Sequence, residues 1–276
     1  MSGTFQTDDY LKIAISACLD AGKAVMEIYK TSFTVEYKTD KSPLTEADKE
    51  ANKIINSYLQ VTDTPIISEE SKVLDFEERR SWERCWVVDP VDGTREFLKK
   101  NGEFTINIAL VDRNIPVYGV IYAPALKRLY FADVRQEKAY KVSLKTNQDT
   151  LETILSNKKI LIPNRESKAF IKVLTSRSHL NKETAEYIDH LKAKYANIKI
   201  ERMGSSLKFC VIAEGKADMY PRFGTTMEWD TAAGQAICNS VGCTVSRMED
   251  DLPLNYNKER LLNPDFLVYR KGFKLL

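Results

Sequence analysis

The sequence predicts an α/β or α+β fold with helices layered on sheets, and three observations lead to this expectation. Two amphipathic helix patterns open the chain, strand patterns follow them, and the two kinds mix beyond a polar, lysine-rich segment at residues 143–159. Helices and sheets each bury one apolar face, so they pack in layers. We place a domain boundary in the polar segment. An N-terminal α+β domain is expected over residues 1–150 and a C-terminal α/β domain over residues 151–276.

The first two helices are predicted from apolar residues at helical spacing. Residues 8–30 carry such residues three or four positions apart, from Leu11 to Ile28. Thr45 is typical of an N-cap, and Asp48 follows three positions later, as in a capping box. The second helix is therefore expected to begin after Thr45 and to run to about residue 59.

The strands are predicted from alternating apolar and polar residues, which favour antiparallel sheets with one buried face. In the N-terminal part they cover residues 65–68, 85–89, 104–111, 117–122, 129–133 and 139–142. In the C-terminal part we expect strands at residues 171–176 and 219–223, and helices at residues 181–195, 205–214 and 229–241. Gly215 and Gly242 are expected to end the last two helices.

Composition and charge exclude several classes of function. The 276 residues are 43% hydrophobic and 29% charged, and the formal net charge is only +2. Such a chain has no excess of cations to hold a nucleic acid or an anionic membrane non-specifically. No apolar run approaches the roughly 20 residues of a membrane-spanning helix, and we expect no signal peptide, because the first residues lack a basic stretch followed by an apolar one. We expect a cytoplasmic protein; peripheral association with the inner membrane and the oligomeric state stay open.

The cysteines and histidines predict neither a disulfide framework nor a zinc site. Five cysteines occur, an odd number with no CxxC pair, which is typical of reduced, buried thiols. The two histidines, His179 and His190, do not stand at metal-ligand spacing from a cysteine. Any metal in this protein is therefore expected to have oxygen ligands.

Residues 89–94 form the most informative stretch, Asp-Pro-Val-Asp-Gly-Thr, directly after an apolar strand. Proline and glycine allow a tight turn that folds Asp89, Asp92 and a backbone carbonyl between them towards one point. Mg²⁺ prefers oxygen ligands of this kind. The hydroxyl of Thr94 stands just beyond them. Taken alone, such a stretch is more often only a polar turn.

Other acids stand at the ends of predicted elements, where functional sites are commonly built. Asp48 lies near a helix start, Glu69 follows a strand, and Asp230 lies at another helix start. Each is also compatible with a capping or surface role. Several carboxylates at one point repel one another unless cations neutralise them. Two or three Mg²⁺ ions would do so and would also bind phosphate oxygens.

Residues 89–94 and 229–234 together resemble the signature pair of the inositol monophosphatase-like, lithium-sensitive, magnesium-dependent phosphatases. The similarity extends to residues 41–48, 68–70 and 101–107 and so spans nearly the whole chain. It implies a layered αβαβα sandwich of the inositol monophosphatase and fructose-1,6-bisphosphatase type. It also implies lithium inhibition and a set of metal ligands: Glu69, Asp89, the backbone carbonyl of Val91, Asp92 and Asp230. Asp48 and Thr94, with a contribution from Glu69, would activate the water.

Residues 176–179, 204–210 and 220–224 resemble the CysQ branch of this family, the 3'(2'),5'-bisphosphate nucleotidases. This implies hydrolysis of 3'-phosphoadenosine 5'-phosphate to AMP and phosphate, linked to sulfate assimilation, with 3'-phosphoadenylyl sulfate as a further substrate. The implied substrate-binding residues are Gly93, Thr94, His179, Ser205, Lys208, Arg222 and Asp230.

A second phosphate needs its own cations, which Lys208 and Arg222 would supply, arginine by a bidentate contact. On pattern alone, a snorkelling lysine and a rim arginine are the favoured interpretation, and only the family resemblance reverses it. Glu228, directly before Trp229, is a position where we expect variation without consequence for the site.

Two other functions remain open. The same metal site would serve an inositol monophosphatase or a fructose-1,6-bisphosphatase, neither of which needs Lys208 and Arg222. A protein of another class, which senses nucleotides without catalysis, would be expected to lack the metal-binding acids. Asp89, Asp92, Glu69 and Asp230 are all present.

Overall fold

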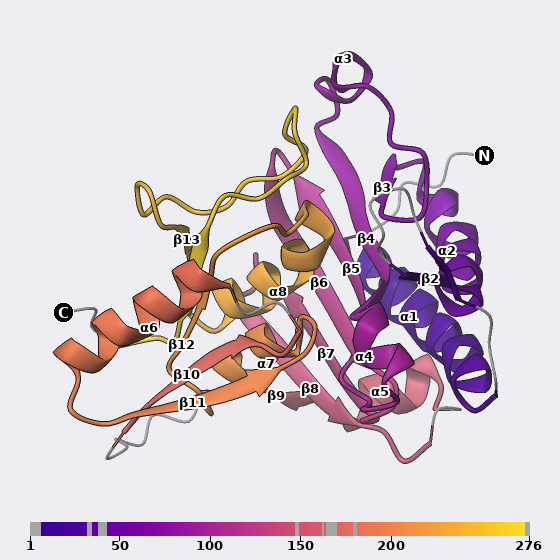
Figure 1. The fold of residues 1–276 in the computed structure, drawn as a ribbon. Coiled ribbons are helices and arrows are strands. Elements are labelled where there is room, and N and C mark those ends of the chain that lie inside the picture. Colours follow the sequence, from indigo (N-terminus) through magenta and orange to yellow (C-terminus); the bar gives the residue numbers. More distant parts are fainter. Residues whose placement is uncertain are drawn as a thin grey trace.

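A computed structural model describes residues 7–31, 35–37, 43–146, 149–161, 163, 170–178 and 181–273. The layers follow one another as helices, sheet, helices, sheet and helix (Figure 1). Helices α1 (Thr7–Tyr29) and α2 (Glu46–Leu59) cover one face of the first sheet. Helices α7 (Leu207–Ala213) and α8 (Glu228–Ser240) lie between the two sheets, and α6 (Lys182–Lys194) packs outside the second. The predicted αβαβα sandwich is confirmed.

The first sheet has seven strands in the order β3-β4-β5-β6-β7-β8-β9. Only β3 and β4 run parallel, and the other neighbours are antiparallel. The strands are β3 (Ile66–Ser68), β4 (Arg84–Asp92), β5 (Thr105–Asp112), β6 (Ile115–Ala123), β7 (Arg128–Asp133), β8 (Lys138–Ser143) and β9 (Lys159–Ile160). The six N-terminal strand predictions match β3 to β8.

The second sheet has five strands in the order β11-β10-β12-β14-β13. Strand β10 is parallel to β11 and β12, whereas β14 is antiparallel to β12 and β13. The strands are β10 (Ile171–Ser176), β11 (Ile198–Met203), β12 (Met219–Arg222), β13 (Thr244–Arg247) and β14 (Phe266–Tyr269). The sequence analysis predicted only β10 and β12, because the other three strands are short or interrupted by charged residues.

Several short elements were not predicted. They are β1 (Val35–Tyr37), β2 (Pro43–Thr45), the 3₁₀ turn Gln60–Thr62, α3 (Phe76–Arg79), α4 (Thr94–Leu98) and α5 (Leu151–Asn157). Helix α5 lies in the segment interpreted as a polar boundary. Thr150 caps this helix, and Ile154 is fully buried. The helix therefore forms with few apolar residues, because its cap and one buried side chain hold it in place. The division at residue 150 stays a prediction; β9, beyond it, still pairs with β8.

The core lies on both faces of the first sheet. One apolar cluster joins α1 and α2 to this sheet, and another fills the space around α7 and α8 between the sheets. All five cysteines are buried and free, as the sequence predicted. Within the described part of the chain, no helix combines the length and the apolar character needed to cross a membrane.

Candidate active site

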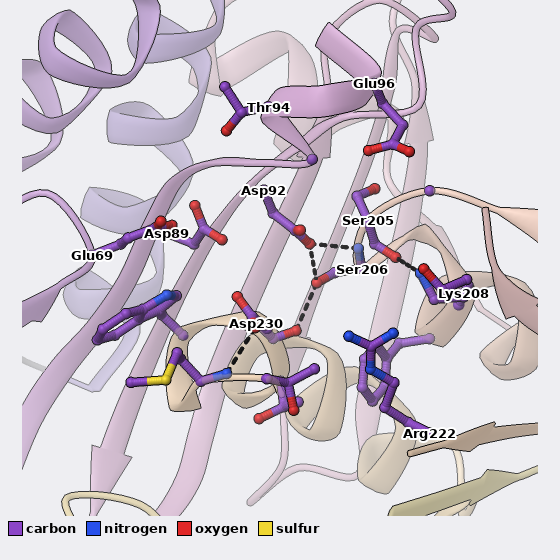
Figure 2. Close-up of a pocket in the computed structure, with 18 of the residues that line it drawn as sticks. Glu69, Asp89, Asp92, Thr94, Glu96, Ser205, Ser206, Lys208, Arg222 and Asp230 are labelled. Atoms are coloured by element: carbon purple, nitrogen blue, oxygen red, sulfur yellow. Dashed lines mark hydrogen bonds between the residues drawn. The ribbon is translucent and has the colours of Figure 1, made fainter. Parts of the chain in front are cut away.

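A cavity of about 440 Å³ opens where the end of β4, the loop before α7 and the start of α8 meet. Glu69 and three aspartates line one side of it, and Lys208 and Arg222 line the other (Figure 2). Of the predicted site residues, the cavity wall includes Glu69, Asp89, Val91, Asp92, Gly93, Thr94, Ser205, Lys208, Arg222 and Asp230. His179 lies outside the described residues.

Three aspartates converge at the acidic side. One carboxylate oxygen from each of Asp89, Asp92 and Asp230 lies within 4.8 Å of the others. Asp89 and Asp92 come from the end of β4, where the pairing with β5 shifts register. Asp230 comes from the first turn of α8, where its carboxylate accepts a hydrogen bond from the Met227 N–H at 2.8 Å. This bond leaves the other oxygen of Asp230 available to the cavity.

Asp92 is held by donors that the sequence analysis did not identify. Its Oδ2 accepts hydrogen bonds from the N–H and the hydroxyl of Ser206, both at 2.6 Å, and from the Asn107 amide at 3.2 Å. The Ser206 hydroxyl also lies 2.7 Å from the backbone oxygen of Asp230. Ser206 therefore joins two predicted metal ligands. Its only local signal is its place in a Gly-Ser-Ser run before an apolar helix, which also fits a simple helix cap.

The electrostatics of the cluster favour a bound cation. Burial, then the charges of Glu69, Asp92, Asp230 and Asp48, raise the pKa of Asp89 well above its usual range. Burial and the charges of Asp92 and Glu69 raise the pKa of Asp230 to about 8. Repulsion of this kind is relieved by a positive ion. Because all the donors are hard oxygens, the cluster fits a divalent cation such as Mg²⁺.

Glu69 stands beside the aspartates rather than among the closest three. It follows β3, and its N–H donates to the Val88 carbonyl of β4 at 3.2 Å, which keeps it next to the end of that strand. Among the neighbouring charges, that of Glu69 raises the pKa of Asp89 most.

Thr94 and Asp48 form a polar pair beside the cluster. The Thr94 hydroxyl lies 3.2 Å from Asp48 Oδ1 and 3.3 Å from the Val91 carbonyl. Asp48 is buried, and its Oδ2 accepts from the Thr45 N–H at 2.8 Å. The predicted capping box at the start of α2 is thus confirmed. It fixes the carboxylate that faces Thr94.

Lys208 and Arg222 form the cationic side, and both side chains are more than nine-tenths buried. The Lys208 ammonium donates to the carbonyls of Met203 and Ser205 and lies 5.0 Å from the Tyr220 ring centroid. Burial lowers the pKa of Lys208 to about 8. Arg222 donates to the Thr225 carbonyl at 2.9 Å, but its buried Nε has no hydrogen-bond partner among the described residues. An unsatisfied buried donor favours an anionic ligand.

The cavity floor depends on close backbone contacts. Gly93 has a φ of +93°, and Ser205, although not a glycine, has a φ of +49°. A Cβ at Gly204 would lie 2.6 Å from Glu96 Cγ and 2.7 Å from the Glu103 carbonyl. Glu96 is a second residue that the sequence analysis missed. It is buried in the cavity wall and accepts a hydrogen bond from the Ser178 hydroxyl at 2.5 Å.

A comparison with known families decides to which family this site belongs. The profile of the inositol monophosphatase family matches residues 6–271. The chain belongs to the inositol monophosphatase family. The predicted family is therefore confirmed, and the two signature segments lie where the carboxylates converge.

Within the inositol monophosphatase family, the chain is similar to several CysQ proteins over most of its length. The 3'(2'),5'-bisphosphate nucleotidase CysQ of Salmonella typhimurium is 42% identical over 254 residues, which is 90% of this chain and 95% of that protein. The CysQ protein of Escherichia coli K12 is 41% identical over the same shares. The crystal structure of CysQ from Bacteroides thetaiotaomicron has a TM-score of 0.86 at 45% identity and covers 97% of this chain and 99% of that one.

More distant members of the family share the fold. The crystal structure of the suppressor protein suhB from Bartonella henselae has a TM-score of 0.73 at 22% identity, and it covers 95% of this chain and 94% of that one. At this level of identity the likeness concerns the layered architecture alone.

Proposed function

We propose that the protein is a 3'(2'),5'-bisphosphate nucleotidase that hydrolyses 3'-phosphoadenosine 5'-phosphate to AMP and phosphate. One observation carries the proposal: the buried pair Lys208 and Arg222 opens on the same cavity as the aspartate cluster. A substrate with two phosphates needs a metal-binding acidic site for one phosphate and a cationic site for the other, in the same cavity. The relatives at 41–42% identity bear the name of this activity, which supports the choice.

The inositol monophosphatase family is metal-dependent, and we infer that Mg²⁺ is the ion here. Two or three Mg²⁺ ions would be held by Glu69, Asp89, the Val91 carbonyl, Asp92 and Asp230. When bound, Mg²⁺ neutralises the phosphate oxygens, activates water and stabilises the leaving oxygen. The raised pKa values of Asp89 and Asp230 support the proposal, because these carboxylates need a positive partner.

The chain's own residues then position and deprotonate the attacking water. The Thr94 hydroxyl donates its proton towards Asp48 Oδ1, so its lone pair is available to accept a proton from water. As the water loses that proton to Thr94 Oγ1, the proton of Thr94 passes to Asp48. The bonds from Thr45 keep Asp48 oriented for this transfer. General base catalysis through such a pair typically contributes ~10²–10⁴-fold to the rate.

The second phosphate is expected to bind at Lys208 and Arg222. The unsatisfied Nε of Arg222 supplies one donor, and the planar guanidinium suits a bidentate contact. We also propose that a phosphate contacts the backbone of Gly93, which lines the cavity with a φ of +93°. We propose substrate contacts for Ser205 and His179 from the family resemblance.

Phosphate release tests the proposal. With Mg²⁺, we expect release from 3'-phosphoadenosine 5'-phosphate to exceed release from inositol 1-phosphate and fructose 1,6-bisphosphate in kcat/KM. Activity on 3'-phosphoadenylyl sulfate would add a second substrate and support the proposed link to sulfate assimilation. Equal or higher activity on inositol 1-phosphate would contradict the proposal. Lack of release from every phosphomonoester would favour a nucleotide-sensing protein. The cytoplasmic location stays a prediction.

A further inference from the structure

We propose that Glu228 is a positioning residue whose buried carboxylate holds the first turn of α8, and with it Asp230, in register with the other metal-binding acids. The inference rests on the metal site of the proposed function but not on the identity of the substrate. The sequence alone predicts that Glu228 varies without consequence for the site. Its surroundings in the structure contradict that interpretation.

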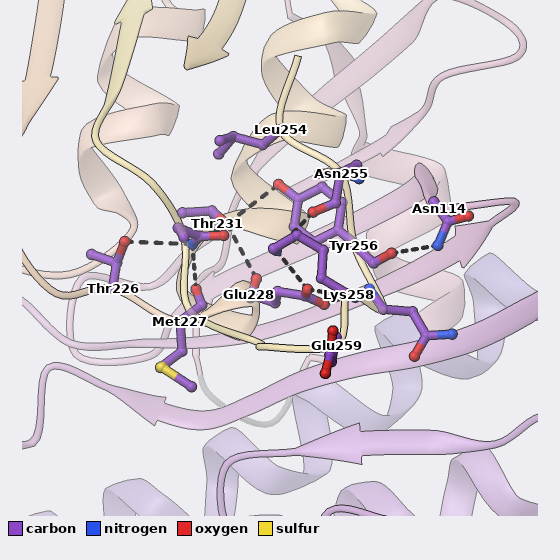
Figure 3. A network of polar contacts seen from close by, with 12 residues as sticks. Asn114, Thr226, Met227, Glu228, Thr231, Leu254, Asn255, Tyr256, Lys258 and Glu259 are labelled. Atoms are coloured by element: carbon purple, nitrogen blue, oxygen red, sulfur yellow. Dashed lines mark hydrogen bonds and ion pairs between the residues drawn. The ribbon is translucent and has the colours of Figure 1, made fainter. Parts of the chain in front are cut away.

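Glu228 is fully buried, and its carboxylate accepts three hydrogen bonds. It accepts hydrogen bonds from the Asn257 N–H at 2.6 Å and the Lys258 N–H at 3.0 Å. The Lys258 ammonium donates a third bond at 2.6 Å (Figure 3). A buried charge is costly unless it is paired and hydrogen-bonded, so this carboxylate holds both partners firmly.

The partners of Glu228 belong to a segment at residues 254–263, here called the clamp loop, which wraps the start of α8. The Leu261 carbonyl accepts from the Glu228 N–H at 2.9 Å. The Asn263 amide donates to the Met227 carbonyl at 2.7 Å and to the Thr231 hydroxyl at 3.0 Å. Met227 in turn donates its N–H to the carboxylate of Asp230. The clamp loop therefore acts on the residue that orients Asp230.

The clamp loop is fixed at its other side to two connections between strands of the first sheet. The buried guanidinium of Arg79, at the end of α3, donates to Asn257 Oδ1 at 2.6 Å and to the Lys258 carbonyl at 3.2 Å. Asn114, between β5 and β6, donates to the Tyr256 carbonyl at 2.6 Å. The clamp loop is thus tied to the β3–β4 connection through Arg79 and to the β5–β6 turn through Asn114.

These contacts connect the two sources of metal ligands. Glu69 directly follows β3 and the two aspartates lie in β4, whereas Asp230 belongs to α8. Metal-binding groups need to be held within ~0.5 Å of their working geometry. Arg79, Asn257 and Glu228 form a continuous chain of hydrogen bonds from α3, in the connection between β3 and β4, to the start of α8. We infer that this chain sets the metal affinity of the site.

Mn²⁺ titration calorimetry of the substrate-free protein tests the inference. We expect Glu228→Gln to weaken Mn²⁺ binding about 10- to 100-fold, as is typical when a residue supporting a metal ligand is lost. Lys258→Met leaves both backbone hydrogen bonds to the Glu228 carboxylate in place and is expected to lose less Mn²⁺ affinity. It provides the test if Glu228→Gln does not fold. Saturating Mg²⁺ should restore most of kcat in both variants.

The matched control is Glu214→Gln. Glu214 is also buried and bonded to lysine, at 2.9 Å from Lys141, but it lies at the end of α7 and not at the start of α8. It should lose thermal stability and keep the wild-type Mn²⁺ affinity. Wild-type affinity in folded Glu228→Gln and Lys258→Met, or an equal loss in Glu214→Gln, would overturn the inference. Because no substrate is present, a wrong choice of nucleotide would leave this result unaffected.

Discussion

Replacing Lys208 by methionine tests the assignment of the second phosphate. Methionine keeps the apolar stem that packs in the buried pocket but removes the ammonium that lies 5.0 Å from the Tyr220 ring centroid. A hydrogen bond to a charged group is worth ~1.5–3 kcal/mol. At 1.36 kcal/mol per factor of ten, this energy corresponds to a loss of about 10- to 150-fold in kcat/KM for 3'-phosphoadenosine 5'-phosphate.

The assay compares this nucleotide with adenosine 3'-phosphate, which lacks the second phosphate. We expect Lys208→Met to change kcat/KM for the single phosphate by less than about threefold, because the contact it removes is absent there. Lys141→Met is the matched control, since Lys141 also lies over a tyrosine ring, at 5.5 Å from Tyr130, but not in the cavity. Equal losses on both nucleotides, or no loss on either, would refute the assignment.

The pH dependence of kcat/KM tests the role of Lys208 in a second way. Burial lowers the pKa of Lys208 to about 8, so the ammonium is protonated below this pH and loses its charge above it. The kcat/KM profile reports groups of the free enzyme. We therefore expect the ratio of kcat/KM for the bisphosphate to that for the single phosphate to fall above pH 8. In Lys208→Met the ratio should be flat over this range.

Three further predictions concern the carboxylate cluster and its supports. Ser206→Ala removes one donor to Asp92 and should weaken Mn²⁺ binding about tenfold in calorimetry; wild-type affinity would contradict the role given to Ser206. Gly204→Ala places a Cβ 2.7 Å from the Glu103 carbonyl oxygen and should lower the free energy of unfolding by ~1–3 kcal/mol, measured by urea denaturation. Wild-type stability would contradict the close packing of Gly204 against Glu103. Without divalent cations, the folded protein keeps protons on Asp89 and Asp230 at pH values where the unfolded chain has already lost them, so the free energy of unfolding falls as pH rises from about 4 to about 8. Mg²⁺ should therefore raise Tm more at pH 8 than at pH 5 in thermal scans, and an equal gain at both would contradict this reasoning.

Local patterns made much of the fold predictable. Apolar spacing located α1 and α2 to within a few residues, and the capping box at Thr45 also fixed the direction of Asp48. The strand patterns before residue 143 matched the structure because their alternation reflects one buried face. The family resemblance, and not the spacing of residues, predicted that Asp230 lies beside Asp89 and Asp92.

The supports of the site could not be predicted, because they depend on contacts between distant segments. Ser206 reaches Asp92 from more than one hundred positions away, and Glu228 meets Lys258 thirty positions later. Neither residue has a neighbour in the sequence that indicates these contacts. Helix α5 was missed for a related reason: its single fully buried residue, Ile154, is too weak a periodic signal against a polar background.

Crystals of the protein soaked in Mn²⁺ test the central claim most directly, through the anomalous signal of the ion. We predict peaks within the space bounded by Glu69, Asp89, Asp92 and Asp230, at ligand distances typical of oxygen-bound divalent ions. Peaks elsewhere, with these four carboxylates left without an ion at saturating Mn²⁺, would contradict the proposed metal site and the catalysis built on it.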